Sequence, residues 1–308
     1  MANAYYHVFD DRGVIRVSGE DRASFLQGLV SNDVLKVTPD RAGYGAFLTA
    51  QGKFLHDFFL IETGEALLIE TAADRLEEFF RKLRMYKLRS KIELSIDSDG
   101  WIVAAVFGSG ALDALKLPAE RGAASAFAEG IAFVDPRHAD AGARLLLPEI
   151  TGSAALQAAG LTSTDREAYD RRRVSLGLPD GAHDMAVEKT VLLEAGFEEL
   201  GGVDFAKGCY MGQELTARTK YRGLVKRRLM PVIINGPLPA PGTEITLDGR
   251  EAGEVRSVVA NGGGGAEGGG MGLAMIRLNR LDEALRSGDP LTAGEATVIP
   301  HKPDWANF

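Results

Sequence analysis

Lys207-Gly208-Cys209-Tyr210-Met211-Gly212-Gln213-Glu214 is the densest cluster of unusual residues in the chain. Gly208 and Gly212 have no Cβ, so they predict a tight turn in which backbone can closely approach a ligand or a neighbour. The residues from Gln213 to Lys220 favour a helix, which would place Cys209 just before a helix N-terminus. That position, together with the bases Lys207 and Arg218, would favour the thiolate over the thiol. We predict that Cys209 is a reactive thiolate; the alternative is that it is a small buried apolar residue.

The size and composition of the chain are those of a globular protein with more than one domain. Of its 308 residues, 45% are hydrophobic and 25% are charged, close to the globular average. Single cores stop growing near ~250–300 residues, so two or three domains are expected.

Several absences predict a cytoplasmic protein. Cys209 is the only cysteine, so no disulfide can form within the chain, and a reducing compartment is favoured. The N-terminus shows no signal-peptide or transit-peptide pattern. The longest apolar stretch, Trp101 to Phe107, is far shorter than the ~18 residues that span a bilayer. We expect no membrane partner.

The positive charges are concentrated in two blocks of sequence. The net charge of -8 argues against general affinity for nucleic acid. The first block comprises Arg81, Lys82, Arg84, Lys87, Arg89 and Lys91. The second comprises Arg218, Lys220, Arg222, Lys226, Arg227 and Arg228. Two concentrated basic segments on an acidic protein favour local attraction of anions by a focused field; the alternative for the second block is a solvated rim.

Apolar periodicity predicts an α+β protein whose C-terminal part is all β. Strands are expected at residues 44–48, 54–61, 66–70, 92–96 and 101–107. A helix between the third and fourth strands would bury Leu76, Phe79, Phe80 and Leu83. Thr164 and Glu167 form a capping-box pair that predicts another helix. From about Leu229, short strands alternate with turns, which predicts a small β-barrel or sandwich.

The octapeptide at 207–214, followed by Arg218, resembles the signature of the YgfZ-type proteins. These are relatives of the glycine-cleavage T-protein that serve iron–sulfur cluster assembly and maintenance. The resemblance covers nearly the whole chain and is especially close to the mitochondrial members. It includes Phe25-Leu26-Gln27-Gly28, Asn32-Asp33-Val34, Met85-Tyr86-Lys87-Leu88-Arg89 and Gly177-Leu178-Pro179.

The resemblance implies an α+β, three-domain, T-protein-like ring around a folate-sized hole. A discontinuous folate-binding domain would comprise residues 1–48 and 136–224 and carry the Cys209 motif. Residues 49–135 would form a ferredoxin-like domain, and residues 225–308 a C-terminal β-barrel. The implied cofactor is tetrahydrofolate or a derivative, with no stable metal.

The resemblance also implies roles for individual residues. Cys209, Lys207 and Arg218 would carry the chemistry, and Gly208, Gly212 and Glu214 would shape the motif. The folate would contact Tyr210, Gln213, Glu194 and Asn32. Because a [4Fe–4S] cluster takes four thiolates and the chain has one, Cys209 could be a transient ligand completed by a partner or a small thiol. It could equally perform thiol chemistry on a client.

The implied function is that of a folate-binding accessory factor for [4Fe–4S] proteins. Its partners would be iron–sulfur enzymes or assembly proteins, with an indirect link to tRNA through tRNA-thiolating enzymes. One alternative is a folate-dependent aminomethyl or one-carbon transferase, and another is a scaffold that binds a client or tRNA. Ser175 stands where T-proteins have a folate-gripping glutamate, and a serine cannot offer the charge-assisted hydrogen bonds of a carboxylate. The sequence leaves open whether the protein is an enzyme.

Overall fold

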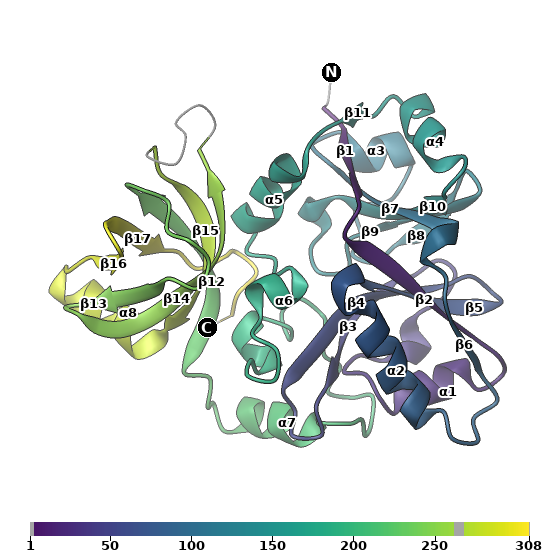
Figure 1. Ribbon diagram of the computed structural model, residues 1–308, viewed down its shortest axis with the longest axis horizontal. Helices are drawn as coiled ribbons and strands as arrows, with labels where there is room; N and C mark the ends of the chain where they lie inside the picture. The colour runs from purple at the N-terminus through teal and green to yellow at the C-terminus, as the bar shows by residue number, and fades with distance from the viewer. Residues whose placement is uncertain (1–2, 262–267, 308) are drawn as a thin grey trace. The chain divides into compact units, whose positions relative to one another are not determined.

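The computed structural model describes residues 3–261 and 268–307 and divides the chain into two compact units (Figure 1). The first unit comprises residues 1–50, 55–169 and 200–213. The second comprises residues 51–54, 170–199 and 214–308. The predicted three-domain boundaries stay a prediction; strands from both sides of residue 48 are present in each sheet of the first unit.

The first unit is built on two sheets. The six-stranded sheet has the order β11-β1-β7-β10-β9-β8, and the five-stranded sheet has the order β3-β4-β5-β2-β6. The strands of the six-stranded sheet are β1 (Tyr5–Phe9), β7 (Trp101–Phe107), β8 (Ala124–Phe127), β9 (Gly130–Val134), β10 (Ala143–Pro148) and β11 (Thr162–Ser163). The strands of the five-stranded sheet are β2 (Arg12–Ser18), β3 (Gly43–Leu48), β4 (Phe54–Glu62), β5 (Ala66–Ala72) and β6 (Glu93–Ile96).

Four helices cover these sheets. They are α1 (Arg22–Gln27), α2 (Leu76–Tyr86), α3 (Ala111–Leu115) and α4 (Gly152–Ala158). Figure 1 shows α2 lying along the five-stranded sheet, where Phe79 is fully buried and packs against Phe47 and Phe58. Leu115 of α3 and Leu156 of α4 belong to the core of the six-stranded sheet. Leu76, Phe79 and Leu83 of the predicted apolar stripe are buried, whereas Phe80 is half-buried, with the guanidinium of Arg84 over its ring.

Short 3-10 turns connect these elements. They are η1 (Val34–Lys36), η2 (Ala73–Arg75), η3 (Ser98–Gly100) and η4 (Ala139–Ala141). Two helices cross the division between the units: α5 (Arg166–Ser175) and α7 (Gln213–Tyr221). The backbone N–H of Ala168 donates to Oδ1 of Asp165 at 2.9 Å, so Asp165 caps α5 instead of the expected Thr164.

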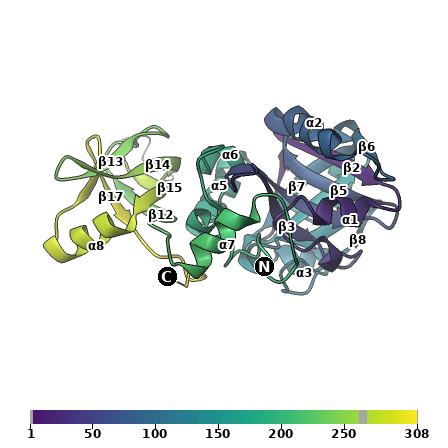
Figure 2. The same ribbon diagram turned by 90° about the horizontal axis from the view of Figure 1, so that it is seen from below.

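The second unit contains a closed barrel with the strand order β12-β15-β14-β13-β16-β17. Its strands are β12 (Arg227–Asn235), β13 (Glu244–Leu247), β14 (Arg250–Ala260), β15 (Gly270–Arg277), β16 (Leu291–Ala293) and β17 (Ala296–Pro300). The helix α8 (Leu278–Ser287), drawn in yellow in Figure 2, contributes Ala284 to the barrel core. The remaining elements are α6 (Gly181–Asp184) and η5 (Leu192–Ala195). The α+β class and the C-terminal barrel are confirmed, whereas α8 was not expected.

His56 of β4 makes the core of the first unit sensitive to pH. Its side chain is 3% exposed, its ring stacks on Phe79 at 4.5 Å, and its Nε2 has no hydrogen-bond partner among the described residues. Burial, assisted by the charges of Arg75 and Lys82, lowers the pKa of His56 to about 3. The ring is therefore neutral in the folded protein at every pH at which the protein would be handled.

We expect the free energy of unfolding to fall by about 2 kcal/mol between pH 7 and pH 5 because of this one residue. The unfolded chain takes up a proton at His56 below about pH 6.5, while the folded chain does not, so acid favours unfolding. Urea denaturation at both pH values measures the effect. His56→Phe keeps the stack on Phe79 and should remove this part of the slope; an unchanged slope would contradict the assignment.

Candidate functional site

Cys209 lies on an exposed loop that precedes α7. Its thiol is free and exposed. Gly208 and Gly212, on either side, have φ of +94° and +80°, in the left-handed region that side chains disfavour. The two glycines therefore form the predicted turn, and the alternative of a buried, purely packing cysteine is wrong.

Lys207 fastens this loop to the turn after α1. Its Nζ donates to the carbonyl oxygens of Val30 at 2.6 Å and Asn32 at 2.7 Å, and it lies 5.1 Å from the ring centroid of Tyr210. Burial lowers the pKa of Lys207 to about 8, against the opposing effect of Asp33 and Asp204. The ammonium form still predominates at pH 7, and its hydrogen bonds hold the backbone at Val30 and Asn32.

The turn itself is fixed by the side chains of the Gln27-to-Asp33 segment. Gln27 donates through Nε2 to Oδ1 of Asp33 at 2.9 Å and accepts from the N–H of Val34 at 2.8 Å. Asn32 donates through Nδ2 to the carbonyls of Tyr44 at 2.6 Å and Gly201 at 2.7 Å. The segments at 25–34 and 207–214, far apart in the sequence, thus meet in the fold, and the first supports the loop that carries Cys209.

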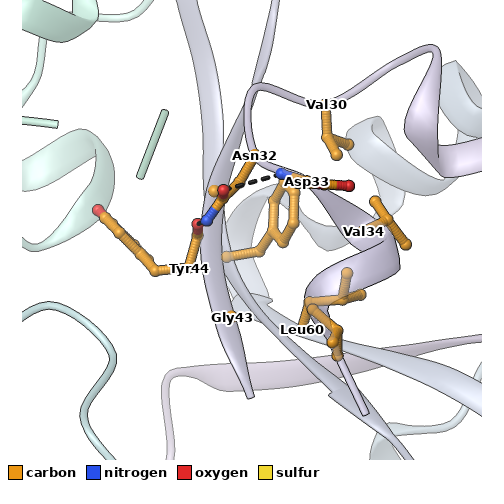
Figure 3. A pocket seen from close by; sticks show the side chains of 10 residues that line it. Val30, Asn32, Asp33, Val34, Gly43, Tyr44 and Leu60 are labelled. Carbon is orange, nitrogen blue, oxygen red and sulfur yellow. Dashed lines mark hydrogen bonds between the residues drawn. The ribbon is translucent and has the colours of Figure 1, made fainter. Parts of the chain in front are cut away.

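A small cavity lies beside this turn (Figure 3). It is lined by Asn32, Val34, Tyr44 and Leu60 among others, and its volume is about 10 Å³. That volume corresponds to about one water molecule. The cavity is therefore far too small for a pterin ring, and the amide of Asn32, drawn in Figure 3 with its bond to the N–H of Asp33, is occupied by protein partners.

Further contacts hold the loop both internally and to the segment after α1. Gln213 accepts from the N–H of Tyr210 at 3.2 Å, and the N–H of Met211 donates to the carbonyl of Gly28 at 3.0 Å. Tyr210 is buried at 9% exposure, whereas Glu214 is exposed. The structure brings Lys207, Cys209, Tyr210, Gln213 and Asn32 together in one region, while Glu194 and Arg218 belong to the second unit.

Glu194 is held by an arginine of the barrel. Its carboxylate accepts from Nε of Arg227 at 2.8 Å and from Nη2 at 3.2 Å, and this hydrogen bonding raises the pKa of Arg227. Arg228 is buried and donates to Glu199 at 3.2 Å and to the carbonyl of Leu193 at 2.9 Å. These contacts fasten β12 to the segment around η5.

The second basic block therefore does not form one solvated rim. Arg227 and Arg228 point to carboxylates of their own unit, and Lys220 pairs with Glu198. Arg218, in the last turn of α7, is exposed, as are Arg222 and Lys226. Among the residues that the structure describes, the guanidinium of Arg218 has no hydrogen bond or ion pair.

Ser175 ends α5 and is exposed, and its Oγ donates to the carbonyl of Arg172 at 2.7 Å. Nearby in the chain, Arg173 is buried and donates to Asp184 at 2.7 Å and to Ser257 at 3.1 Å. Burial on its own disfavours the charge of Arg173, but Asp184, Asp180 and Asp170 outweigh it and raise the pKa. This polar network joins α5 and α6 to β14. Ser175 itself bonds within α5, so its position supplies a hydroxyl and not a carboxylate.

A buried polar cluster in the first unit was not predicted. The carboxylate of Glu70, which has no exposed surface, accepts hydrogen bonds from the guanidinium groups of Arg144, at 3.2 Å, and Arg12. Arg144 also donates to Oη of Tyr169 at 2.9 Å. The ring of Phe59 lies under the guanidinium of Arg144 at 4.3 Å. The sequence does contain a sign of this cluster, because the charged residues Glu70 and Arg144 interrupt largely apolar strands.

A second buried ion pair also contacts the ring of Phe59. Arg137 is 5.0 Å from the centroid of Phe59 and donates to Asp135 at 2.7 Å and 3.0 Å. Burial on its own disfavours the charge of Asp135, but the adjacent Arg137 outweighs it and lowers the pKa of Asp135. Two buried, hydrogen-bonded arginines therefore contact the ring of Phe59.

Residues 3–261 and 268–307 contain no group of three or more His, Cys, Asp or Glu side chains arranged to hold a metal ion. Within the same residues, no helix has the length and apolar character needed to cross a bilayer.

Comparison with known sequences places the chain among proteins of iron–sulfur metabolism. The profile of the CAF17 C-terminal beta-barrel domain matches residues 226–308. The iron-sulfur cluster assembly factor IBA57, mitochondrial, of Mus musculus is 33% identical over 96% of this chain and 84% of its own length. The protein of the same name from Homo sapiens is 32% identical, over 96% and 83%. The homologue from Pyricularia oryzae is 32% identical, over 95% and 77%.

Comparison with solved structures confirms the T-protein-like fold. The glycine cleavage system aminomethyltransferase T from Bartonella henselae aligns with a TM-score of 0.77, over 99% of this chain and 87% of its own. At 15% sequence identity this likeness concerns the fold alone.

The expectation of a cytoplasmic protein is wrong. The relatives are named mitochondrial, which points to mitochondria instead.

Proposed function

Because the chain belongs to the IBA57 family of iron–sulfur cluster assembly factors, we propose that Cys209 supplies one thiolate ligand to a cluster that a partner completes. The observation that carries this proposal is the free, exposed thiol on a loop fixed at both ends. A [4Fe–4S] cluster takes four thiolates, and this chain supplies only one. The other ligands come from a partner protein or a small thiol.

The rigid support of the loop suits such a ligand. Lys207 and the turn at Asn32 hold the backbone before Cys209, and the bond from Met211 to Gly28 holds the backbone after it. The sulfur is thereby presented to solvent with little conformational freedom to lose on binding. When a client cysteine replaces Cys209, the client thiol gives up its proton and forms one Fe–S bond, the Fe–S bond to Cys209 breaks, and the released thiolate takes up a proton; the remaining ligands exchange in the same way.

The proposed clients are [4Fe–4S] proteins, including enzymes that thiolate tRNA. The exposed cations Arg218, Arg222 and Lys226 follow the Cys209 motif in the chain and would attract an acidic client. The test is a strain that lacks the protein: supplying the chain should restore the activity of a [4Fe–4S] enzyme and the content of thiolated tRNA nucleosides. Restoration of the enzyme without the nucleosides would remove the tRNA-thiolating enzymes from the set of clients.

Tetrahydrofolate, or a derivative, is the proposed small ligand. Its support is the T-protein-like fold and the resemblance of the motif; Ser175 in place of a carboxylate predicts a weaker or different grip on the pterin. Aminomethyl transfer is not proposed, because no observation favours it.

Calorimetric titration of the purified protein with tetrahydrofolate tests this part. We expect saturable heat at one site per chain. At 100 times Kd, bound folate should add about 2.7 kcal/mol to the free energy of unfolding and raise Tm by about 5 °C. p-Aminobenzoylglutamate, which lacks the pterin, serves as the matched control ligand. No heat and no thermal shift with tetrahydrofolate would remove folate from the account and leave the thiol proposal standing.

A further inference from the structure

The end of α2 exposes two apolar side chains outside the core: Met85 is 74% exposed and Leu88 is 87% exposed. Between them, Tyr86 is 41% exposed, and its ring packs on the buried Phe47. Single exposed apolar residues are ordinary, but a cluster rimmed by charges marks an interaction site. These residues belong to the Met85-to-Arg89 motif of the sequence analysis, for which the proposed function gives no role.

Leu88 stands in a backbone conformation that a leucine rarely adopts. Its φ is +40°, in the left-handed region, just after the helix end at Lys87. Glycine is the usual residue at such a position, because it has no Cβ to clash. The strain is not repaid by packing within the chain, since the side chain is almost wholly in solvent. A contact outside the chain is the physical reason to retain a large aliphatic residue there.

The surroundings of Leu88 are positively charged. Arg81, Arg84 and Arg89 are exposed and Lys87 is half-buried, and none of the four pairs with a carboxylate among the described residues. Two acids of this region are already paired: Glu78 with Arg75 and Lys82, and Glu20 with Lys91. A third, Glu77, is exposed and accepts from Nε of Arg81 through its backbone carbonyl at 3.3 Å. This local positive field contrasts with the net charge of -8 of the whole chain.

We propose that Arg81, Arg84, Met85, Lys87, Leu88 and Arg89 form a docking surface, the α2-end surface, for an acidic segment of a protein partner. An aliphatic or aromatic side chain of that segment packs on Met85 and Leu88, and its carboxylates pair with the surrounding cations. The surface lies in a different part of the sequence from Cys209, so it adds a partner contact beyond the thiol chemistry.

Two other occupants fit less well. A membrane would need a long amphipathic face, but the apolar stripe of α2, Leu76, Phe79 and Leu83, is buried in the core. A nucleic acid would use the cations but gain nothing from Met85 and Leu88. An acidic protein segment is the occupant that uses both the charge and the exposed aliphatic side chains.

Methyl NMR on the full-length protein, labelled at methionine and leucine, tests the surface. The probe is a synthetic helical peptide of glutamates with leucine and phenylalanine on one face. We expect saturable shifts of the Met85 and Leu88 methyl signals, with an affinity that falls as salt is raised. A peptide with serine in place of leucine and phenylalanine should bind at least ~10-fold more weakly.

Leu88→Gly separates docking from folding. It should weaken the peptide at least ~10-fold while raising Tm by a few degrees, because glycine relieves the left-handed strain. Arg84→Glu combined with Arg89→Glu should abolish measurable binding. Ile150→Ala, at a distant side chain that is 94% exposed, is the matched control and should change neither quantity.

Three results would overturn the proposal. The first is equal affinity for the serine peptide or for phosphatidylglycerol vesicles, which would reduce the surface to a charge effect. The second is unchanged binding in Leu88→Gly, and the third is a lower Tm in that variant. Cys209→Ser should bind the peptide normally, so a failure of the thiol proposal and a failure of this one are distinguishable.

Discussion

In a strain that lacks the protein, Cys209→Ser is expected to restore almost no [4Fe–4S] enzyme activity. The restored activity should be about 100-fold lower than with the wild-type chain. The hydroxyl of serine is not deprotonated near neutral pH and is a poor ligand for iron, so the Fe–S bond to residue 209 cannot form. The shape of the loop should be retained, because its supports are Lys207, Gln27 and Asn32. The measurement is the activity of a [4Fe–4S] enzyme in extracts at matched protein levels.

The folding control for this variant is its thermal stability. The thiol is exposed, so the free energy of unfolding of Cys209→Ser should lie within about 0.5 kcal/mol of the wild type. Lys189→Met, at an exposed cation of the second unit that has no role in the proposal, serves as a second control and should restore activity fully. Full restoration by Cys209→Ser would contradict a ligand role for the sulfur.

Glu70→Gln is expected to lower the free energy of unfolding by about 3 to 5 kcal/mol. The substitution removes the carboxylate charge from a site without solvent and leaves the guanidinium groups of Arg12 and Arg144 buried without that compensation. Urea denaturation at pH 7 measures the loss.

The matched control is Glu65→Gln. Glu65 also pairs with an arginine, Arg16, at 3.4 Å, but its side chain is 88% exposed. The same chemical change there should cost less than about 0.5 kcal/mol. A loss below about 1 kcal/mol for Glu70→Gln would show that the buried cluster is not what stabilises the first unit.

Elements with a regular apolar period were predictable from the sequence. The strand at 101–107 and the strands beginning near Phe54 and Ala66 are present with nearly the expected bounds, because apolar side chains meet a core there. The helix α8 also has apolar residues at helical spacing, namely Leu278, Leu281 and Ala284. It was not predicted, because it lies between two strands and its short pattern is hard to distinguish from the all-β region around it. At α5 the cap is Asp165, since local pattern locates a helix end only to within a residue or two.

The site was predictable only where local chemistry determines it. The glycines around Cys209 predicted the turn, because a left-handed backbone is a property of single residues. The ion pairs of Arg227 with Glu194 and of Arg228 with Glu199 were not predictable, since the partners are about 30 residues apart in the chain. Likewise, Asn32 supports the backbone because the fold brings the carbonyls of Tyr44 and Gly201 within hydrogen-bond distance of its amide, which the sequence does not show.

The most direct test of Cys209 as a cluster ligand uses selenium as a label. Cys209→selenocysteine places one selenium atom in the chain, because no other cysteine is present. After cluster loading with iron and sulfide in the presence of glutathione or a partner iron–sulfur protein, X-ray absorption at the selenium edge reports the neighbours of that atom. We predict an iron shell around selenium in the loaded sample; a spectrum with carbon neighbours alone, while iron is bound, would contradict the account.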